Sequence, residues 1–336
     1  MNINVPQEVL VLVASFLPTA SDICNFRFSC RSFATAGFPV LFHSVSVLNT
    51  IEHIGGFQST LGNSALYVTR HLTIQHGEWP VVTSRKAWLQ HFLRIKEDLE
   101  SVDNAFAKYL HFIQQEQQRT FDQDTHFRQL LQALPMLNSL TLSHINKWSW
   151  KPFRSPHYNE LVRRISTLPH WESVVSQPLL SILALLNTFP KIRRLNIYGS
   201  LSPALTQRRH PQILHLEVTS IAGYHKNSSN IESFLSSFPN LRTVLISMEG
   251  GGPTGGTTMP LNQLYWPDLH TCTLVNITSE EGELFDFVQR HKGLRFLCVV
   301  GATFTSGSWD SFFTQYQCLQ NPPSFQTRSL ESWRRS

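Results

Sequence analysis

The residues best suited to chemistry in this chain are histidine and cysteine, whose side chains bind metals, transfer protons and act as nucleophiles. The sequence holds 15 histidines and 5 cysteines. The cysteines form no C-x-x-C pair, and the histidines are scattered, with none paired at metal-ligand spacing beside a cysteine or carboxylate. The H-E-x-x-H, G-x-S-x-G and P-loop patterns do not occur. We therefore expect a protein that is not an enzyme and that uses no metal or cofactor.

Two segments contain residue types that can contact phosphates or bases. The stretch 249–258 reads EGGGPTGGTT, but it lacks the Gly-Lys-Ser/Thr of a phosphate-binding loop, so we interpret it as a flexible connection. Residues 146–176 mix tryptophans with lysines and arginines. Such a segment either stacks on nucleic acid or forms a loop whose tryptophans pack back on the protein, and we favour the second. The net charge is +5, yet the basic residues do not cluster strongly along the chain, so we expect no nucleic-acid partner.

Composition indicates a folded chain in a reducing compartment. Hydrophobic residues make up 41% and charged residues 15% of the 336 positions, a length that suggests about two domains. The odd cysteine count argues against a disulfide framework. The apolar run near the N-terminus contains Glu8 and is too short to span a bilayer. We expect a cytoplasmic or nuclear protein that does not bind membranes.

The first fifty residues predict three short helices. Pro6 fits a first helical turn, Pro18 ends that helix, Ser21 or Asp22 can cap the second, and the third runs from about Cys30 to near Gly37. The first helix carries two neighbouring apolar stripes, which consist of Val9, Leu12, Val13 and Phe16 on one side and of Leu10 and Leu17 on the other. So small a bundle encloses little core, so we expect a partner to cover the excess apolar area.

Several short motifs in this region resemble the F-box of fungal F-box proteins. They are Pro-x-Glu-x-Leu at 6–10, Phe-Leu at 16–17, Asp-Ile at 22–23, Phe-Arg at 26–27 and Cys-Arg-x-Phe at 30–33. Val5 departs from the leucine that is usual before the proline. The resemblance implies docking onto the Skp-type adaptor of an SCF (cullin–RING) ubiquitin ligase. The adaptor contacts that it implies are Pro6, Leu10, Val13, Leu17, Ile23, Cys30 and Phe33. An ordinary helical cap on the following repeats remains the alternative.

The region 48–134 is expected to be a strand followed by helices. Between Trp88 and Ile113 apolar residues recur at spacings of 4, 3, 4, 3, 4, 4 and 3, a near-heptad seam. The seam consists of Trp88, Phe92, Ile95, Leu99, Val102, Phe106, Leu110 and Ile113. It forms either an intermolecular coiled coil or, as we favour, a helix or helical hairpin that packs on its neighbours, including the amphipathic stretch 121–134.

From Pro135 onward one short phrase recurs. Its copies are PMLNSLTL at 135–142, PKIRRLNI at 190–197, PQILHLEV at 211–218, PNLRTVLI at 239–246, PDLHTCTL at 267–274 and LRFLCV at 294–299. The proline stops a preceding helix, and the two closing apolar residues alternate with polar ones, as in a strand with one buried face. Helical segments separate the phrases, so strand and helix alternate and predict a curved solenoid with an inner parallel sheet.

The phrase resembles the leucine-rich repeats of F-box proteins, although the usual buried asparagine or cysteine is missing, so the repeats are degenerate. The predicted fold is therefore α/β, with a three-helix F-box at 1–47, a connecting region at 48–134, a leucine-rich-repeat-like domain at 135–318 and a disordered tail at 319–336. The resemblance implies a substrate-recognition subunit of an SCF-type ubiquitin ligase, with a cullin scaffold and an unknown protein substrate as partners. A repeat-based interaction scaffold that is independent of the ligase is the alternative.

Period-two alternation predicts which strand residues could meet a substrate. Leu195 and Ile197 are expected to be buried, so their neighbours face outward. The resulting candidate substrate contacts are Arg194, Asn196, Tyr198, His215 and Glu217. On a later strand Phe296, Cys298 and Val300 face the same way and are apolar. They form either a second part of the binding surface or a patch that the C-terminal tail covers.

Overall fold

A computed structural model describes residues 5–91, 102–118, 123–145, 156–168, 176–201, 208–221, 228–248, 258–319 and 321–328. The fold is mixed α/β, with a large parallel sheet of nine strands in the order β1-β2-β3-β4-β5-β6-β7-β9-β11 and a short pair β10-β8. The α/β class and the parallel sheet agree with the sequence prediction.

The chain divides into two compact units. The first comprises residues Met1–Gln75, Trp79–Thr141 and Trp150–Leu168, and the second comprises His76–Glu78, Leu142–Ser149 and Pro169–Ser336. Each unit is described separately below. No helix in the described ranges has the length and apolar character needed to cross a membrane.

The first unit begins with the three predicted helices. They are α1 (Gln7–Ser15), α2 (Ala20–Ser29) and α3 (Arg31–Leu41). Two details differ from the sequence prediction. The side chain of Thr19, rather than that of Ser21 or Asp22, caps α2 by accepting a hydrogen bond from the Asp22 amide at 3.1 Å. Helix α3 continues past Gly37 to Leu41. The aliphatic stem of Arg27 packs where a β-carbon at Gly37 would stand, 2.5 Å from Arg27 Cγ, so this position favours glycine for close packing.

Helices and short strands complete the first unit. Strands β1 (Ser44–Leu48) and β2 (His71–His76) pair in parallel, and β3 runs over Ser139–His144 across the boundary of the two units. The remaining helices are α4 (Ile51–Val68), α5 (Arg85–Trp88), α6 (Val102–Gln118), α7 (Gln123–Gln132) and α8 (Pro156–Ile165).

The buried stripe of α6 agrees only in part with the predicted heptad seam, of which Ile113 is buried. The buried residues of this helix are Ala105, Tyr109, Phe112 and Ile113, whereas Phe106 and Leu110 of the predicted seam are only half-buried. Trp88 of α5 contacts both Phe106 and Tyr109, with ring centroids 5.3 and 6.0 Å away, and Trp79 contacts Phe112 at 5.3 Å. The stripe packs within the chain, as the favoured interpretation expected. Residues 92–101 of the seam lie outside the described residues.

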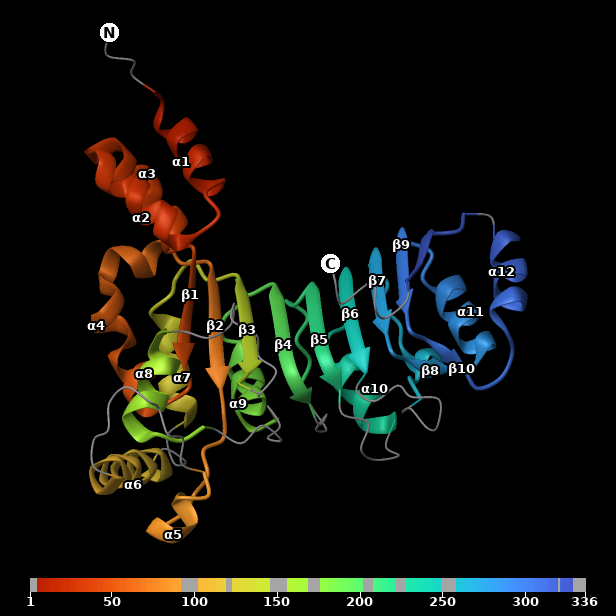
Figure 1. Ribbon diagram of the computed structural model, residues 1–336. Helices are drawn as coiled ribbons and strands as arrows, with labels where there is room; N and C mark the ends of the chain where they lie inside the picture. The colour runs from red at the N-terminus through yellow and green to blue at the C-terminus, as the bar shows by residue number, and fades with distance from the viewer. Residues whose placement is uncertain are drawn as a thin grey trace. The chain divides into compact units, whose positions relative to one another are not determined.

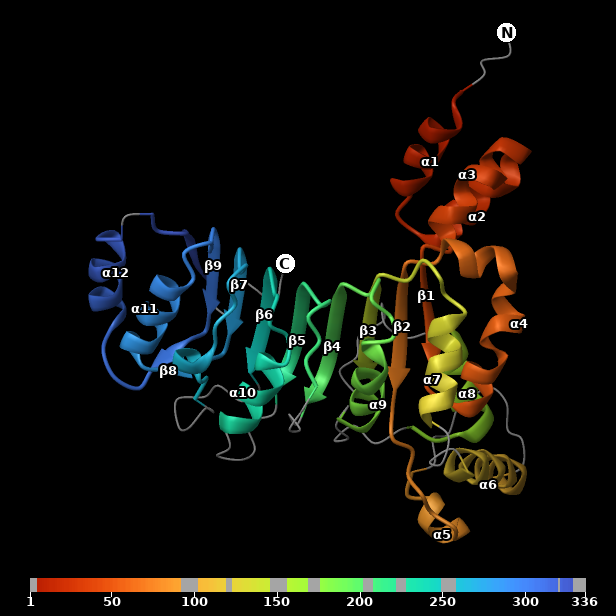
Figure 2. The same cartoon turned by 180° about the vertical axis from the view of Figure 1, so that it is seen from behind.

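In the second unit the repeated phrases form neighbouring parallel strands (Figures 1 and 2). These strands are β4 (Arg194–Leu201), β5 (His215–Ile221), β6 (Thr243–Met248), β7 (Thr271–Val275) and β9 (Phe296–Val300), with β8 (Thr278–Ser279) and β10 (Thr303–Phe304) as the short pair. The two closing apolar residues of every copy are buried, as predicted. They are Leu140 and Leu142 in β3, Leu195 and Ile197, Leu216 and Val218, Val244 and Ile246, Cys272 and Leu274, and Leu297 and Val299.

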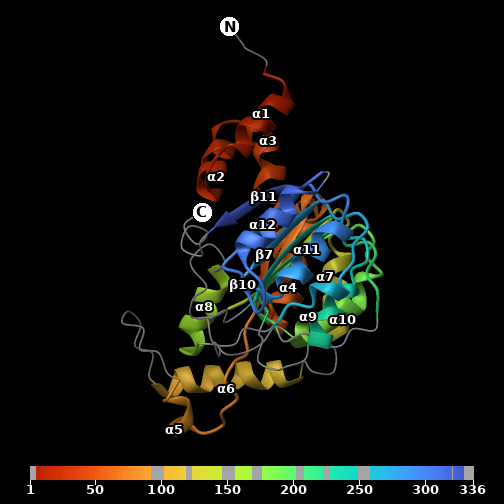
Figure 3. The ribbon, with the colours of Figure 1, turned by 90° about the vertical axis from the view of Figure 1, so that its right-hand side faces the viewer.

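Helices between the strands supply the other side of this core. They are α9 (Ser176–Leu186), α10 (Ser228–Ser236), η3 (Leu261–Gln263), α11 (Glu281–Arg290) and α12 (Trp309–Gln317). Figure 3 looks along the row of strands and shows α9 and α10 together on one side of the sheet. The apolar faces of the helices, with Leu186, Phe234 and Phe287 fully buried, pack in this core.

The C-terminal segment corrects another prediction. The disordered tail was expected from residue 319, but Ser324–Arg328 form strand β11, which pairs in parallel with β9. Phe325 of this strand lies 5.7 Å from the ring of Phe312 and 5.3 Å from that of Tyr316 on α12. These ring contacts hold the segment against α12. No periodicity in the sequence of the tail predicts them. Residues 329–336 lie outside the described residues, as do 146–155, 169–175 and the glycine-rich 249–257.

Candidate functional site

The first candidate site is an exposed apolar surface on α1, which we call the α1 surface. Its members are Val5, Val9, Leu12, Val13 and Phe16, with exposed fractions of 39%, 45%, 56%, 46% and 78%. Leu10 and Ala14 lie about 100° around the helix and are buried. One side of α1 therefore packs inside the three-helix bundle, and the other predicted apolar stripe is exposed to solvent. Contiguous exposed apolar side chains of this kind mark interaction surfaces.

The α2 and α3 helices hold the bundle beneath this surface rigid. The rings of Phe26 and Phe33 stack with centroids 4.4 Å apart and planes 5° from parallel. The guanidinium of Arg27 lies over the ring of Phe38 at 5.3 Å, and its Nε donates to the carbonyl of Ala34 at 3.4 Å. Phe28 of α2, by contrast, is 87% exposed. Like the residues of the α1 surface, it is apolar and does not belong to the core of the bundle.

The structure separates the seven residues named as adaptor contacts into three groups. Pro6, Val13 and Cys30 are exposed, and Leu17 and Phe33 are half-buried. Leu10 and Ile23 are buried inside the bundle, so their side chains contact the chain itself. Sequence reasoning named none of Val9, Leu12, Phe16 and Phe28 as contacts, although the first three form the helical stripe that it described.

The second candidate site is the face of the sheet opposite the buried residues of β4 and β5. In register, Arg194 lies beside His215, Asn196 beside Glu217, and Tyr198 beside Thr219. All of these outward residues are exposed or half-buried, whereas Leu195, Ile197, Leu216 and Val218 between them are buried. The five candidate substrate contacts therefore come together on two neighbouring strands, as the alternation predicted.

Hydrogen bonding and burial perturb the ionisable groups on this face. The hydroxyl of Tyr198 donates to the carboxylate of Glu217, and burial together with that negative charge raises the pKa of Tyr198. Burial also raises the pKa of Glu217, while the hydrogen bond from Tyr198 and the charge of Arg194 oppose that rise. Burial, followed by the charges of Arg194 and Arg242, lowers the pKa of His215.

Arg242 is a member of this site that sequence reasoning missed. It precedes β6 and is exposed, and its charge acts on His215 of the neighbouring strand. The signal was present in the phrase, because Arg242 occupies the same position in its copy as Arg193 does in the earlier one. Recognising it requires the register of β5 and β6, which pairs His215 with Thr243.

The same face changes character toward β7 and β9. Val275, Cys298 and Val300 form an apolar cluster with exposed fractions of 1%, 6% and 0%, and Phe296 packs against it. Cys298 and Val300 are buried and Phe296 is half-buried, so Cys298 and Val300 do not form the exposed second binding surface that was one of the two alternatives. The polar candidate site is therefore confined to the β4–β6 part of this face.

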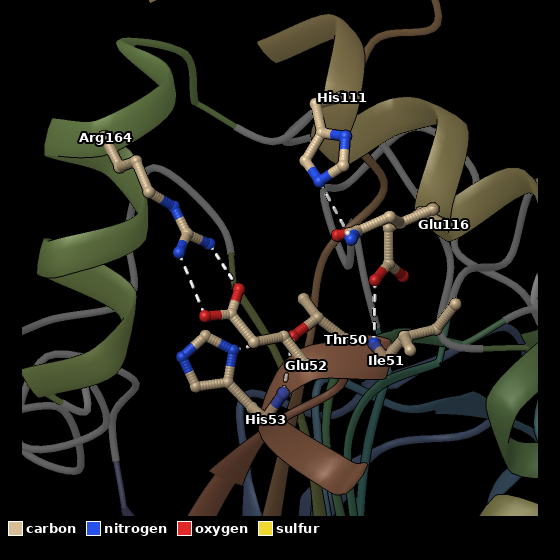
Figure 4. A network of polar contacts seen from close by, with 8 residues as sticks. Thr50, Ile51, Glu52, His53, His111, Glu116 and Arg164 are labelled. Atoms are coloured by element: carbon tan, nitrogen blue, oxygen red, sulfur yellow. Dashed lines mark hydrogen bonds and ion pairs between the residues drawn. The ribbon is translucent and has the colours of Figure 1, made fainter. Parts of the chain in front are cut away.

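The first unit contains a cavity of about 360 Å³ between α4, α8 and β1. Its ionisable wall residues are engaged with each other, because Arg164 of α8 donates two hydrogen bonds to Glu52 of α4, and Thr50 Oγ1 lies 2.7 Å from His53 Nδ1. Figure 4 shows these contacts, with Glu116 of α6 accepting a hydrogen bond from the Ile51 amide at 2.7 Å. The network ties three helices together, and we assign it a structural role.

No metal centre is formed by the described residues, in which no group of three or more His, Cys, Asp or Glu side chains could hold an ion. The cysteines in this part of the chain are free thiols, and burial raises the pKa of Cys272.

No known family model matches the chain, and no curated protein matches it significantly.

Proposed function

We propose that this protein is the substrate-recognition subunit of an SCF-type ubiquitin ligase. Its α1–α3 bundle would act as an F-box that binds the Skp-type adaptor and, through it, the cullin scaffold. The strands β4–β6 would belong to a degenerate leucine-rich-repeat solenoid that binds a protein substrate. Such a subunit carries no catalytic residues of its own and acts in the cytoplasm or nucleus.

The observation that carries this proposal is the α1 surface. Val9, Leu12 and Phe16 remain exposed at 45%, 56% and 78% although the opposite stripe of the same helix already supplies the core of the bundle. A helix that only capped the repeats would need one apolar stripe. The second stripe coincides with the segment whose motifs resemble the F-box, so one partner accounts for both features.

Leu10 and Ile23 are buried in the bundle, so in this proposal they do not contact the adaptor directly. Leu10 is 5% and Ile23 is 9% exposed, so these motif residues support the bundle that presents the α1 surface. Direct contact with the adaptor falls instead to Val9, Leu12, Val13, Phe16 and Phe28, together with the exposed Pro6 and Cys30.

The repeats support the second half of the proposal. Each copy of the phrase forms a strand whose next neighbour in the sheet is the following copy from β4 through β9. Parallel strands stacked in chain order are how leucine-rich repeats present one face to a partner. The polar face with Arg194, Tyr198 and Glu217 is the substrate surface that we propose.

The test is adaptor capture by the full chain with the variant Val9→Asp/Phe16→Asp. A carboxylate facing an apolar partner costs on the order of several kcal/mol, so adaptor binding should fall by roughly 100-fold or more. The control is Val81→Asp/Met136→Asp, at two other exposed apolar residues, which are 60% and 42% exposed. The control should bind adaptor like the parent chain.

None of the four substituted residues is buried, so we expect both variants to remain folded. Thermal unfolding measures whether they do. Adaptor capture that survives Val9→Asp/Phe16→Asp contradicts the assignment of the α1 surface. Failure of the parent chain to capture adaptor or cullin contradicts the ligase role and favours a repeat-based scaffold that is independent of the ligase.

A further inference from the structure

Basic side chains that are far apart in the sequence form one row at the beginning of the strands in the second unit. The carbonyl of Arg193 accepts hydrogen bonds from the amides of Leu214 and His215 at 2.8 and 3.1 Å. The Leu214 carbonyl accepts in the same way from Arg242 at 2.8 Å. The pattern continues, with the Arg242 carbonyl bound to the His270 amide at 2.9 Å and the His270 carbonyl bound to the Arg295 amide at 2.8 Å.

These bonds place five residues at the same level of five neighbouring strands, and four of the five are basic. We call the four the basic row, which consists of Arg193 before β4, Arg242 before β6, His270 before β7 and Arg295 before β9. Each follows a buried residue, namely Ile192, Leu241, Leu269 and Leu294. The three arginines are exposed, and His270 is half-buried.

The row has few internal counterions. Arg193 donates to the carbonyl of Gln212 at 3.3 Å, whereas Arg242 and Arg295 form no ion pair or side-chain hydrogen bond with any residue in the described part of the chain. Asp268 is exposed two residues before His270, and Glu217 is engaged by Tyr198. Burial and, after it, the charges of Arg194 and Arg242 lower the pKa of His215, and Arg194 also acts on Glu217.

The spacing of the arginines limits what could neutralise them. Adjacent strands lie about 4.8 Å apart, so Arg193, Arg242 and Arg295, each two strands from the next, recur at intervals of roughly 10 Å. A peptide in the polyproline II conformation rises about 3.1 Å per residue with three residues per turn, so every third side chain lies on the same side at intervals of about 9 Å. Guanidinium groups favour paired hydrogen bonds to carboxylates.

We propose that the basic row binds an acidic protein segment in the polyproline II conformation, which crosses the strands and presents a carboxylate at every third residue. The inference deepens the proposed function, because it names the chemistry of the substrate that the receptor would recognise. It also stands apart from adaptor docking, since the row and the α1 surface share no residue.

The experiment measures binding of the full chain to fluorescent ten-residue peptides by anisotropy. One peptide carries glutamates at positions 1, 4 and 7 among serines and glycines, and a second has the same composition with its three glutamates adjacent. The spaced peptide should bind severalfold more tightly. Equal affinity for the two peptides, or no binding of the spaced one, overturns the proposal.

The variant Arg242→Glu/Arg295→Glu should weaken binding of the spaced peptide by on the order of tenfold or more, because two attractions become repulsions. The matched control is Arg128→Glu/Arg163→Glu, which makes the same change of charge at exposed residues of α7 and α8. Binding that falls equally in both variants shows a general charge effect and overturns the assignment to the row. Circular dichroism confirms that each variant is folded.

A single-stranded oligonucleotide of ten residues tests the competing polyanion. Binding of the oligonucleotide that is tighter than that of the spaced peptide, and that is lost in Arg242→Glu/Arg295→Glu, assigns the row to nucleic acid and overturns the proposal. The Val9→Asp/Phe16→Asp variant separates the two proposals, because it should lose adaptor and retain the spaced peptide.

Discussion

Arg164 of α8 and Glu52 of α4 form a two-pronged ion pair across 112 positions of the sequence, with Arg164 Nη1 and Glu52 Oε1 2.9 Å apart. The side chains keep 36% and 50% of their exposure, so water screens the attraction. A double-mutant cycle of Arg164→Ala and Glu52→Ala should give a coupling free energy of about 0.5–1 kcal/mol by urea unfolding.

High salt should reduce that coupling, because mobile ions screen exposed charges. A coupling above about 2 kcal/mol would contradict this prediction and would mean that the pair is shielded from water.

The two stripes of α1 should respond oppositely to truncation. Leu10 is 5% exposed and Leu12 is 56% exposed. Leu10→Ala removes buried apolar contacts and leaves a cavity, so we expect it to destabilise the bundle by about 2–4 kcal/mol. Leu12→Ala should change the free energy of unfolding by less than about 0.5 kcal/mol.

Chemical unfolding followed by the helical circular dichroism signal measures both effects. Adaptor binding, measured on the folded protein, should weaken in Leu12→Ala. Equal destabilisation by the two substitutions would show that the α1 surface is buried within the chain.

Gly199 and Gly282 differ in backbone conformation and in the space available for an added β-carbon. Gly199 in β4 has φ of 125°, and a β-carbon there would stand 2.3 Å from that of His144. Gly199→Ala should therefore destabilise the second unit by roughly 2 kcal/mol or more. Gly282 lies in the helix α11 with no atom within 4 Å of an added β-carbon.

Gly282→Ala should stabilise the protein by about 0.5–1 kcal/mol, because alanine loses less backbone entropy in a helix. Thermal unfolding of the two variants measures the difference. A melting temperature that rises for Gly199→Ala would contradict the strained geometry.

Acid should weaken the second unit through His210. The residue is buried, its Nδ1 lies 3.1 Å from Asn187 Oδ1, and its ring lies 5.6 Å from that of Phe238. Burial and, secondarily, the charge of Arg208 lower the pKa of His210 from 6.5 to about 4. The unfolded chain therefore binds a proton before the folded one does.

The contribution of neutral His210 to the free energy of unfolding is fully present above pH 6.5. It is lost as the pH falls from 6.5 toward 4, because protonation favours the unfolded state in that window. His210→Gln should flatten this part of the profile, whereas His111→Gln, at an exposed position of α6, should leave it unchanged. Urea unfolding at several pH values between 7 and 4.5 provides the measurement. A profile for His210→Gln that matches that of the parent chain would remove His210 as the cause.

The sequence alone determined the local pattern of this protein. Alternation at Leu195 and Ile197 predicted a strand with one buried face, and the recurrence of that phrase predicted neighbouring parallel strands. The sequence also predicted the two apolar stripes of the first helix, because helical periodicity follows from backbone geometry alone. These are properties of a few adjacent residues, for which local rules suffice.

The tertiary structure decided everything that depends on which elements meet. It placed Leu10 inside the bundle and left Phe16 in solvent, rotated the buried stripe of α6 toward Tyr109, and paired Ser324–Arg328 with β9. It also brought the basic row together from positions 193, 242, 270 and 295, where composition indicated no cluster. Long-range packing and strand register set these relationships, and neither is encoded in the spacing of neighbouring residues.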